Sequence, residues 1–97
     1  MSTEQTPDPV IKQFREQISD TDRAIVDALN KRLKLVAQIK AYKDSQGLGF
    51  LDPKREQQML DDLARSNRGP LSEEGLRELL QAILDLSKRE VARPPSG

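Results

Sequence analysis

Three cations occupy positions at which a helix would be expected to carry apolar side chains. Taken at helical spacing, residues 10–43 give one stripe, whose members are Ile11, Arg15, Ile18, Asp22, Ile25, Leu29, Arg32, Val36, Ile39 and Lys43. Arg32 and Lys43 are about three turns apart, or about 16 Å along a helix axis. A cation on an apolar face needs an acidic side chain, water or an anionic ligand, because burying it unpaired is unfavourable. The stripe therefore indicates a site for a small anion.

The same stripe has an ordinary interpretation, in which long cationic side chains lie along the apolar surface and Asp22 pairs with one of them. Arg15 lies about 25 Å from Arg32 along the helix, so one small molecule cannot contact both within one chain. If two copies of the helix pack antiparallel, Arg15 of one copy faces the region between Arg32 and Lys43 of the other. We therefore expect a homodimer with two equivalent sites and Arg15 donated across the interface.

Further candidate residues lie later in the chain. Arg55 and Glu56 fall in the first turn of a second expected helix and can close such a site, although such a pair taken alone is more often a solvated helix start than a ligand group. Ser87 is a polar member of a third apolar stripe, where it can simply bond the carbonyl of the preceding turn. Because guanidinium groups match carboxylates bidentately, these donors favour a small dicarboxylate with a hydroxyl group over a phosphate.

Three helices are expected to position these side chains. The first spans residues 10–43, which contain no proline or glycine, and Asp8 is its expected N-cap. At about 51 Å this helix exceeds the width of a domain of this length, so we expect it to reach into a partner. Asp52 and Ser72 are the expected N-caps of the second and third helices. The predicted layout is a disordered tail at residues 1–9, an all-α domain at residues 10–91 and a second disordered tail at residues 92–97.

Composition narrows the possible functions. Lys plus Arg and Asp plus Glu each number 16, and aromatic residues make up 3%, which disfavours a nucleic-acid partner. Cysteine and histidine are both absent, so disulfides, thiolate nucleophiles, imidazole bases and the usual zinc ligands are excluded. We expect no metal and no cofactor. The polar N-terminus does not resemble a signal peptide and no stretch predicts a membrane span, so we expect a soluble cytoplasmic protein.

Four stretches in this order and spacing are similar to the all-helical chorismate mutases, a family of intertwined dimers. They are Phe-Arg-Glu-Gln-Ile-Ser-Asp-Thr-Asp at 14–22, Leu-Asn-Lys-Arg-Leu-Lys-Leu-Val at 29–36, Ile-Lys-Ala-Tyr-Lys at 39–43 and Leu-Asp-Pro-Lys-Arg-Glu-Gln-Gln-Met-Leu at 51–60. With the third helix, the resemblance covers residues 10–91. It implies a rearrangement of chorismate to prephenate in phenylalanine and tyrosine biosynthesis, without a cofactor.

The resemblance also implies roles for the three cations. Arg15, from the partner chain, and Arg32 would grip the enolpyruvyl carboxylate of chorismate. Lys43 would bond that carboxylate and the ether oxygen. The rearrangement is unimolecular and pericyclic, so it needs no nucleophile, no proton transfer and no metal. The protein holds the compact chair conformer and stabilises the negative charge that grows on the ether oxygen.

The remaining roles are implied in the same way, with one departure. Arg55 matches an arginine near the ring carboxylate, with Ser87 as a helper, and Glu56 with the backbone near Asp52 would take the ring hydroxyl. Many members carry a glutamine or glutamate one turn after the serine as a second donor to the ether oxygen, where this chain has Val91. Loss of that donor would cost roughly 3 kcal/mol, about a hundredfold in rate.

We therefore expect modest activity in isolation, raised by a partner. The resemblance makes 3-deoxy-arabino-heptulosonate 7-phosphate synthase the first partner to consider. Two alternatives stay open from the sequence. One is an isochorismate pyruvate-lyase on the same scaffold, and the other is a non-catalytic helical dimerisation or regulatory module.

Overall fold

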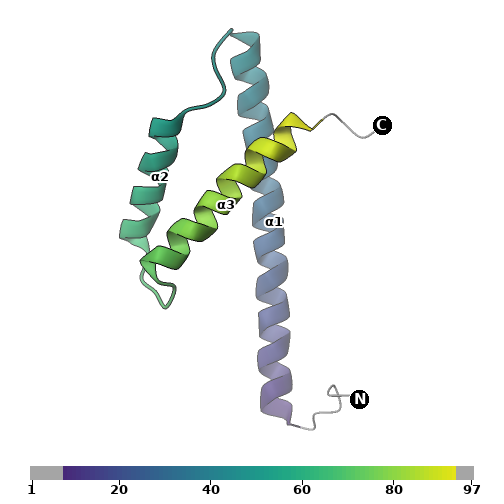
Figure 1. Ribbon diagram of the computed structural model, residues 1–97. Helices are drawn as coiled ribbons and strands as arrows, with labels where there is room; N and C mark the ends of the chain where they lie inside the picture. The colour runs from purple at the N-terminus through teal and green to yellow at the C-terminus, as the bar shows by residue number, and fades with distance from the viewer. Residues whose placement is uncertain (1–7, 94–97) are drawn as a thin grey trace. The chain divides into compact units, whose positions relative to one another are not determined.

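The computed structural model describes residues 8–93, and every regular element within them is an α-helix (Figure 1). The helices are α1 (Pro9–Ser45), α2 (Pro53–Ser66) and α3 (Glu73–Ala92). The predicted all-α class with three helices is confirmed. Two compact units meet inside α1, one ending at Arg32 and the other beginning at Leu33. The predicted tails lie mostly outside the described residues.

Helix α1 is slightly longer at both ends than the predicted span of residues 10–43. It begins at Pro9, where the Asp8 carboxylate accepts a hydrogen bond from the Val10 N–H at 2.9 Å, as expected of an N-cap. At the other end the helix continues to Ser45. The backbone N–H of Leu48 donates to the Lys43 carbonyl at 2.8 Å, and that of Gly47 donates to the Asp44 carbonyl at 3.3 Å.

This pair of bonds is a Schellman motif, which satisfies the last carbonyls of a helix around one residue in the left-handed region. Gly47 is that residue, with a φ of 70°. The end of α1 is therefore decided by the backbone conformation of Gly47. Helical residues continue up to that point, including two that the sequence interpretation assigned to the loop.

Side-chain caps start the other two helices as predicted. The Asp52 carboxylate accepts a hydrogen bond from the Arg55 N–H at 3.1 Å, and Pro53 occupies the first turn of α2. The Ser72 hydroxyl accepts from the Gly75 N–H at 3.0 Å at the start of α3. Between the two helices, the Asn67 side chain donates to the Leu71 carbonyl at 2.7 Å. These local bonds satisfy the backbone groups that helix ends leave open.

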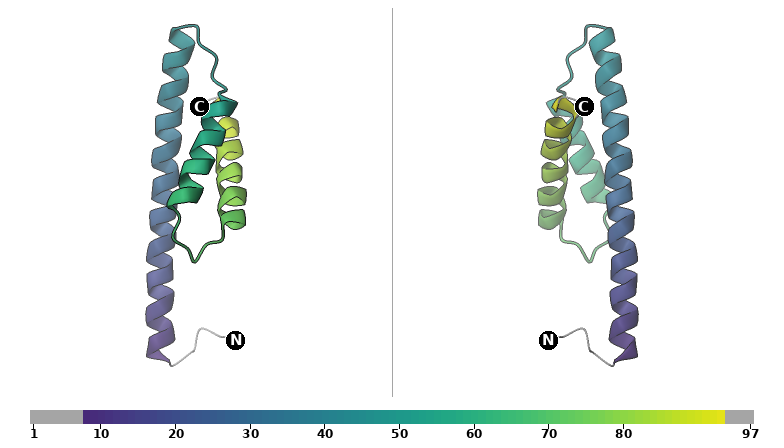
Figure 2. Two further views of the ribbon diagram at one scale, coloured as in Figure 1. Left: turned by 90° about the vertical axis from the view of Figure 1, so that its left-hand side faces the viewer. Right: turned by 90° about the vertical axis from the view of Figure 1, so that its right-hand side faces the viewer.

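Helices α2 and α3 lie side by side and run in opposite directions from the turn that joins them (Figure 2). Each helix carries one of the two buried apolar residues of the described chain, Leu60 on α2 and Leu84 on α3, which are 7% and 5% exposed. Burial of such side chains is the main source of stability in a pair of helices this short. The hairpin thus supplies the small core of the second unit.

Two ion pairs join α2 to α3 as well. Lys88 Nζ lies 3.0 Å from Glu56 Oε1, and Arg77 Nη1 lies 3.0 Å from Asp61 Oδ1. Arg77 also pairs with Glu73 on its own helix at 3.0 Å. The hydrogen bond from Arg77 holds the pKa of Asp61 below its usual range. Both bridges are partly exposed, so they order the hairpin more than they stabilise it.

The apolar side chains of α1 are largely uncovered, and none of its residues is fully buried. In the unit that ends at Arg32, the large side chains with at least 40% exposure are Val10, Ile11, Phe14, Ile18, Ile25 and Val26. A row of exposed apolar side chains along one helix is unusual for a monomer and typical of an interaction surface. No helix within residues 8–93 combines the length and the hydrophobicity needed to cross a membrane.

The end of α1 leads to a first prediction. We expect Gly47→Ala to lower the free energy of unfolding by about 1 kcal/mol, because an L side chain is strained at positive φ. A Cβ at this position would meet no atom within 4 Å, so crowding adds nothing to that penalty. Urea denaturation at fixed protein concentration measures the effect.

Gly49 is the matched control, because a Cβ there also meets open space and its φ is not positive. Gly49→Ala should leave stability unchanged or raise it slightly. Equal unfolding midpoints for the two variants would contradict the role assigned to Gly47.

Candidate functional site

The residues predicted to form a site are divided between the two units. The unit that ends at Arg32 contains Arg15 and Arg32, and the unit that begins at Leu33 contains Lys43, Asp52, Arg55, Glu56, Ser87 and Val91. Within the second unit these side chains come from the end of α1, the start of α2 and the last turns of α3. Each group therefore has its own surroundings, set by the unit to which it belongs.

Lys43 is half-buried near the C-terminal end of α1. Its ammonium lies 3.5 Å from the backbone carbonyl of Phe50, in the loop that leads to α2. The Lys43 carbonyl accepts the bond from Leu48 that ends the helix. Backbone and side chain of this one residue are therefore both tied to the loop. A cation held in this way offers its remaining N–H donors to an anionic or ether oxygen.

The first turn of α2 brings Asp52, Arg55 and Glu56 together. One Asp52 oxygen accepts the capping bond from the Arg55 backbone, while the Arg55 side chain is exposed. Glu56 is half-buried and points toward α3, where its Oε1 accepts a hydrogen bond from Lys88 Nζ. The turn therefore presents an exposed guanidinium beside an anchored carboxylate.

Lys88 is a charged neighbour of the site that the sequence interpretation missed. It directly follows Ser87, and it lies one turn beyond Leu84 on α3, just as Glu56 lies one turn before Leu60 on α2. Aligning Leu60 with Leu84 in an antiparallel hairpin would have predicted that Lys88 lies opposite Glu56. The spacing of residues within one helix does not predict which residues of two helices face each other.

Ser87 is 4% exposed, the one buried polar residue among residues 8–93. Its hydroxyl donates to the Ile83 carbonyl at 2.7 Å, so the ordinary interpretation of this serine as a residue bonded to its own helix is confirmed. Val91, one turn later, is half-buried and has no polar atom in its side chain.

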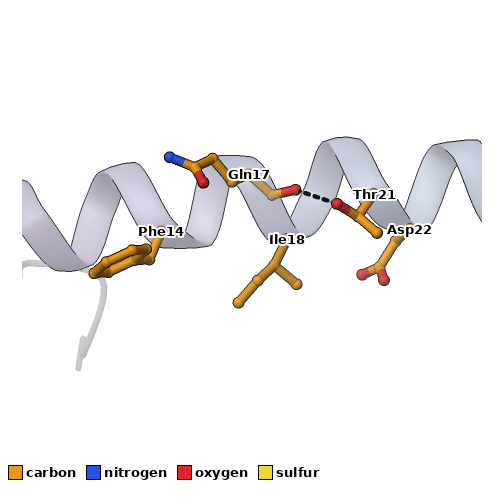
Figure 3. A pocket seen from close by; sticks show the side chains of 5 residues that line it. All are labelled: Phe14, Gln17, Ile18, Thr21 and Asp22. Carbon is orange, nitrogen blue, oxygen red and sulfur yellow. Dashed lines mark hydrogen bonds between the residues drawn. The ribbon is translucent and has the colours of Figure 1, made fainter. Parts of the chain in front are cut away.

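In the other unit, Arg15 is exposed and Arg32 is half-buried on α1. A shallow depression with a volume of about 370 Å³ lies on the same helix and is lined by Phe14, Gln17, Ile18, Thr21 and Asp22 (Figure 3). Phe14, Ile18 and Asp22 project to one side of the helix in Figure 3, while the Thr21 hydroxyl donates to the Gln17 carbonyl at 2.9 Å. The depression is mainly apolar, which suits a packed side chain better than a polar ligand.

The described residues offer donors and acceptors but no metal centre. No three His, Cys, Asp or Glu side chains come together within residues 8–93 in a way that could hold a metal ion. The charged and polar groups instead comprise guanidinium and ammonium donors, a carboxylate and a buried hydroxyl oxygen. Such a set can bind and orient an organic anion and can stabilise charge that develops on an oxygen atom.

Solved structures of similar proteins cover nearly the whole helical region. This chain is 35% identical to chorismate mutase from Thermus thermophilus in its Form I structure, with a TM-score of 0.78 over 79% of this chain and 96% of that chain. For the Form II structure the identity is 32% and the TM-score 0.82, over 89% of this chain and 98% of that chain. The likeness therefore extends to sequence as well as fold.

Curated relatives place the same region within larger proteins. The chain is 31% identical to the bifunctional chorismate mutase/prephenate dehydratase of Aquifex aeolicus (strain VF5), in an alignment of 87 residues that covers 81% of this chain and 24% of that protein. It is 46% identical over 47 residues to the T-protein of Enterobacter agglomerans, which is 48% of this chain and 13% of that protein. The chain thus spans about a quarter or less of the length of these relatives.

The sequence profile of the family described as chorismate mutase type II matches residues 14–91, which contain all the candidate site residues. Together with the similar structures, this match extends over most of the chain. The chain belongs to the chorismate mutase type II family.

Proposed function

We propose that this protein is a chorismate mutase, which rearranges chorismate to prephenate in phenylalanine and tyrosine biosynthesis. The observation that carries the proposal is the half-buried Lys43, whose ammonium is held 3.5 Å from the Phe50 carbonyl in a segment that matches the family. Arg32 on the same helix and the anchored Glu56 on α2 add the donors and the acceptor that the substrate requires. A cytoplasmic location is part of this proposal.

The reaction makes modest demands on side-chain chemistry. One carbon–oxygen bond breaks and one carbon–carbon bond forms in a single pericyclic step, and no group on the protein needs to be alkylated or protonated. The protein must select the compact conformer of the substrate and stabilise negative charge on the ether oxygen. In this proposal Lys43 supplies that stabilisation through its ammonium, which lies 3.5 Å from the Phe50 carbonyl.

The other residues take complementary roles in this proposal. Arg32 and the partner's Arg15 bind the enolpyruvyl carboxylate, and Arg55 lies near the ring carboxylate with Ser87 as a helper. Glu56 and the backbone near Asp52 accept the ring hydroxyl. Guanidinium groups suit this purpose because their forked donors match carboxylate oxygens in pairs.

We place the protein in a homodimer because α1 exposes a row of apolar side chains up to Arg32. Phe14 and Ile18 are both 59% exposed, and they line the shallow depression on that helix. A second copy in antiparallel orientation would cover these side chains and bring Arg15 to the site of the other chain. Covering the apolar row and completing the site then require the same contact.

The test of the function is loss of chorismate absorbance on the purified protein, with prephenate identified as the product. We expect turnover that falls about a hundredfold or more in Lys43→Met, because one preorganised donor to the developing charge is removed. Lys40→Met is the matched control, since Lys40 lies on the same helix and pairs with Asp44 at the surface. It should keep full activity.

Other products would identify the alternative functions. Pyruvate and salicylate formed from isochorismate, with no prephenate from chorismate, would support a lyase on the same scaffold. A folded dimer without turnover and without binding of chorismate would support a non-catalytic module. Either result would contradict the proposed mutase.

Arg15 donation can be tested by mixing two inactive variants. Arg15→Ala and Lys43→Met should each be inactive, but a mixed dimer has one site with both residues intact. After equilibration of equal amounts, about a quarter of wild-type activity should return, because about half of the dimers are mixed and one of their two sites is complete. Activity that stays at the level of the separate variants would refute donation across the interface.

Val91 leads to a prediction about rate and partner. We expect Val91→Gln to raise kcat/KM by up to about a hundredfold, because an amide N–H is added near the ether oxygen. We expect 3-deoxy-arabino-heptulosonate 7-phosphate synthase to raise the rate of the unmodified protein and to affect Val91→Gln less. Ala92→Gln, at the exposed neighbouring position, is the control for adding an amide to this turn. Equal rates for the unmodified protein and Val91→Gln would contradict the role given to this position.

A further inference from the structure

The ion pair between Lys88 and Glu56 differs from the other salt bridge of the α2–α3 hairpin in its surroundings. Lys88 Nζ lies 3.0 Å from Glu56 Oε1, and the two side chains are 34% and 25% exposed. Lys88 directly follows the buried Ser87, so the pair lies at the end of the hairpin that carries the proposed substrate-binding groups of this unit. The pair Arg77–Asp61 lies nearer the turn between the helices.

The geometry of the pair leaves Glu56 able to accept another hydrogen bond. Within residues 8–93, the Glu56 carboxylate accepts a hydrogen bond from Lys88 Nζ through its Oε1 atom. The second oxygen, Oε2, keeps its lone pairs for a hydroxyl donor. A glutamate side chain otherwise rotates about several bonds, and a partner on a neighbouring helix restricts that rotation before any ligand is bound.

Electrostatic repulsion between Glu56 and the substrate is a second reason why Glu56 would need Lys88. Chorismate carries two carboxylates, so an unpaired Glu56 carboxylate near it would repel the substrate that it is meant to hold. An ammonium group 3.0 Å away offsets part of that repulsion, because its attraction for the substrate carboxylates opposes the repulsion by Glu56. Lys88 would thus allow a carboxylate to serve as a hydroxyl acceptor inside a site for a dianion.

We propose that Lys88 is a positioning residue that orients Glu56 and neutralises its charge, so that Glu56 can accept the hydroxyl group of a dianionic substrate. This inference rests on the proposed function, which assigns the ring hydroxyl to Glu56. Lys88 itself touches no reacting atom. It acts through Glu56, so the effect of removing it must depend on Glu56 being present.

The experiment is a double-mutant cycle on chorismate kinetics with Lys88→Met, Glu56→Gln and the combined variant. Lys88→Met should raise KM about tenfold with a much smaller change in kcat, because ground-state and transition-state binding weaken together. In the Glu56→Gln background the same change should alter KM by less than about twofold, because the group it serves is absent. Lys88→Arg, which keeps the cation, should restore KM to within about twofold of wild type.

Arg77→Met is the matched structural control, since it removes the other ion pair of the same two helices. Thermal unfolding at fixed concentration should change little in either Lys88→Met or Arg77→Met, as expected of partly exposed pairs. KM should rise in Lys88→Met alone. A purely structural role would instead predict similar kinetics for both variants.

The outcomes separate this inference from the function on which it rests. A wild-type protein that neither converts nor binds chorismate overturns both. An active wild type with unchanged KM in Lys88→Met overturns the role of Lys88 alone. So does a rise in KM that persists undiminished in the Glu56→Gln background, because Lys88 would then act independently of Glu56.

Discussion

The contact between α2 and α3 positions two candidate site residues of the second unit, Glu56 and Ser87, together with Lys88. Leu60 and Leu84 are the buried apolar residues of these helices, and the ion pairs Lys88–Glu56 and Arg77–Asp61 fit an antiparallel register. One turn away from the leucines on each helix, that register brings Glu56 opposite Lys88 and places Ser87 in the buried part of the hairpin. Packing of the two leucines therefore goes together with the positions of the Glu56 carboxylate, the Lys88 ammonium and the Ser87 hydroxyl. Loosening that contact would move all three groups together, because packed side chains rather than loop bonds hold them.

The second constraint is electrostatic, and it distinguishes the cations of this chain by their surroundings. Arg77 is engaged by two carboxylates and lowers the pKa of Asp61, which is the behaviour of a residue that joins helices. Lys43 instead contacts a backbone carbonyl, which is a neutral acceptor. A cation held by a neutral acceptor is suited to an anionic ligand. This difference, more than the number of charges on the stripe, supports the role proposed for Lys43.

Local chemistry in the sequence was enough to predict the three helices and the caps at Asp52 and Ser72, because capping depends on residues within one turn. The end of α1 was placed two residues early, because a helix can continue through Asp44 and Ser45 until a glycine adopts positive φ. Lys88 was missed for a different reason. Its partner Glu56 is on another helix, and the register between two helices depends on packing that no spacing within one helix records. The substrate-binding roles of all the candidate residues stay predictions, and that of Arg15 depends on a second chain as well.

In the proposed dimer, stability and catalysis depend on the same residues of α1. The row of exposed apolar side chains up to Arg32 would lose its contact with water only when a second copy packs against it, and Arg15 lies within that row. A monomer would therefore bear both an uncovered apolar surface and an incomplete anion site. Burial of each exposed apolar side chain would contribute roughly 1–2 kcal/mol to association. The same association would bring Arg15 to the site of the other chain. In this proposal, assembly of the dimer is the step that completes the site.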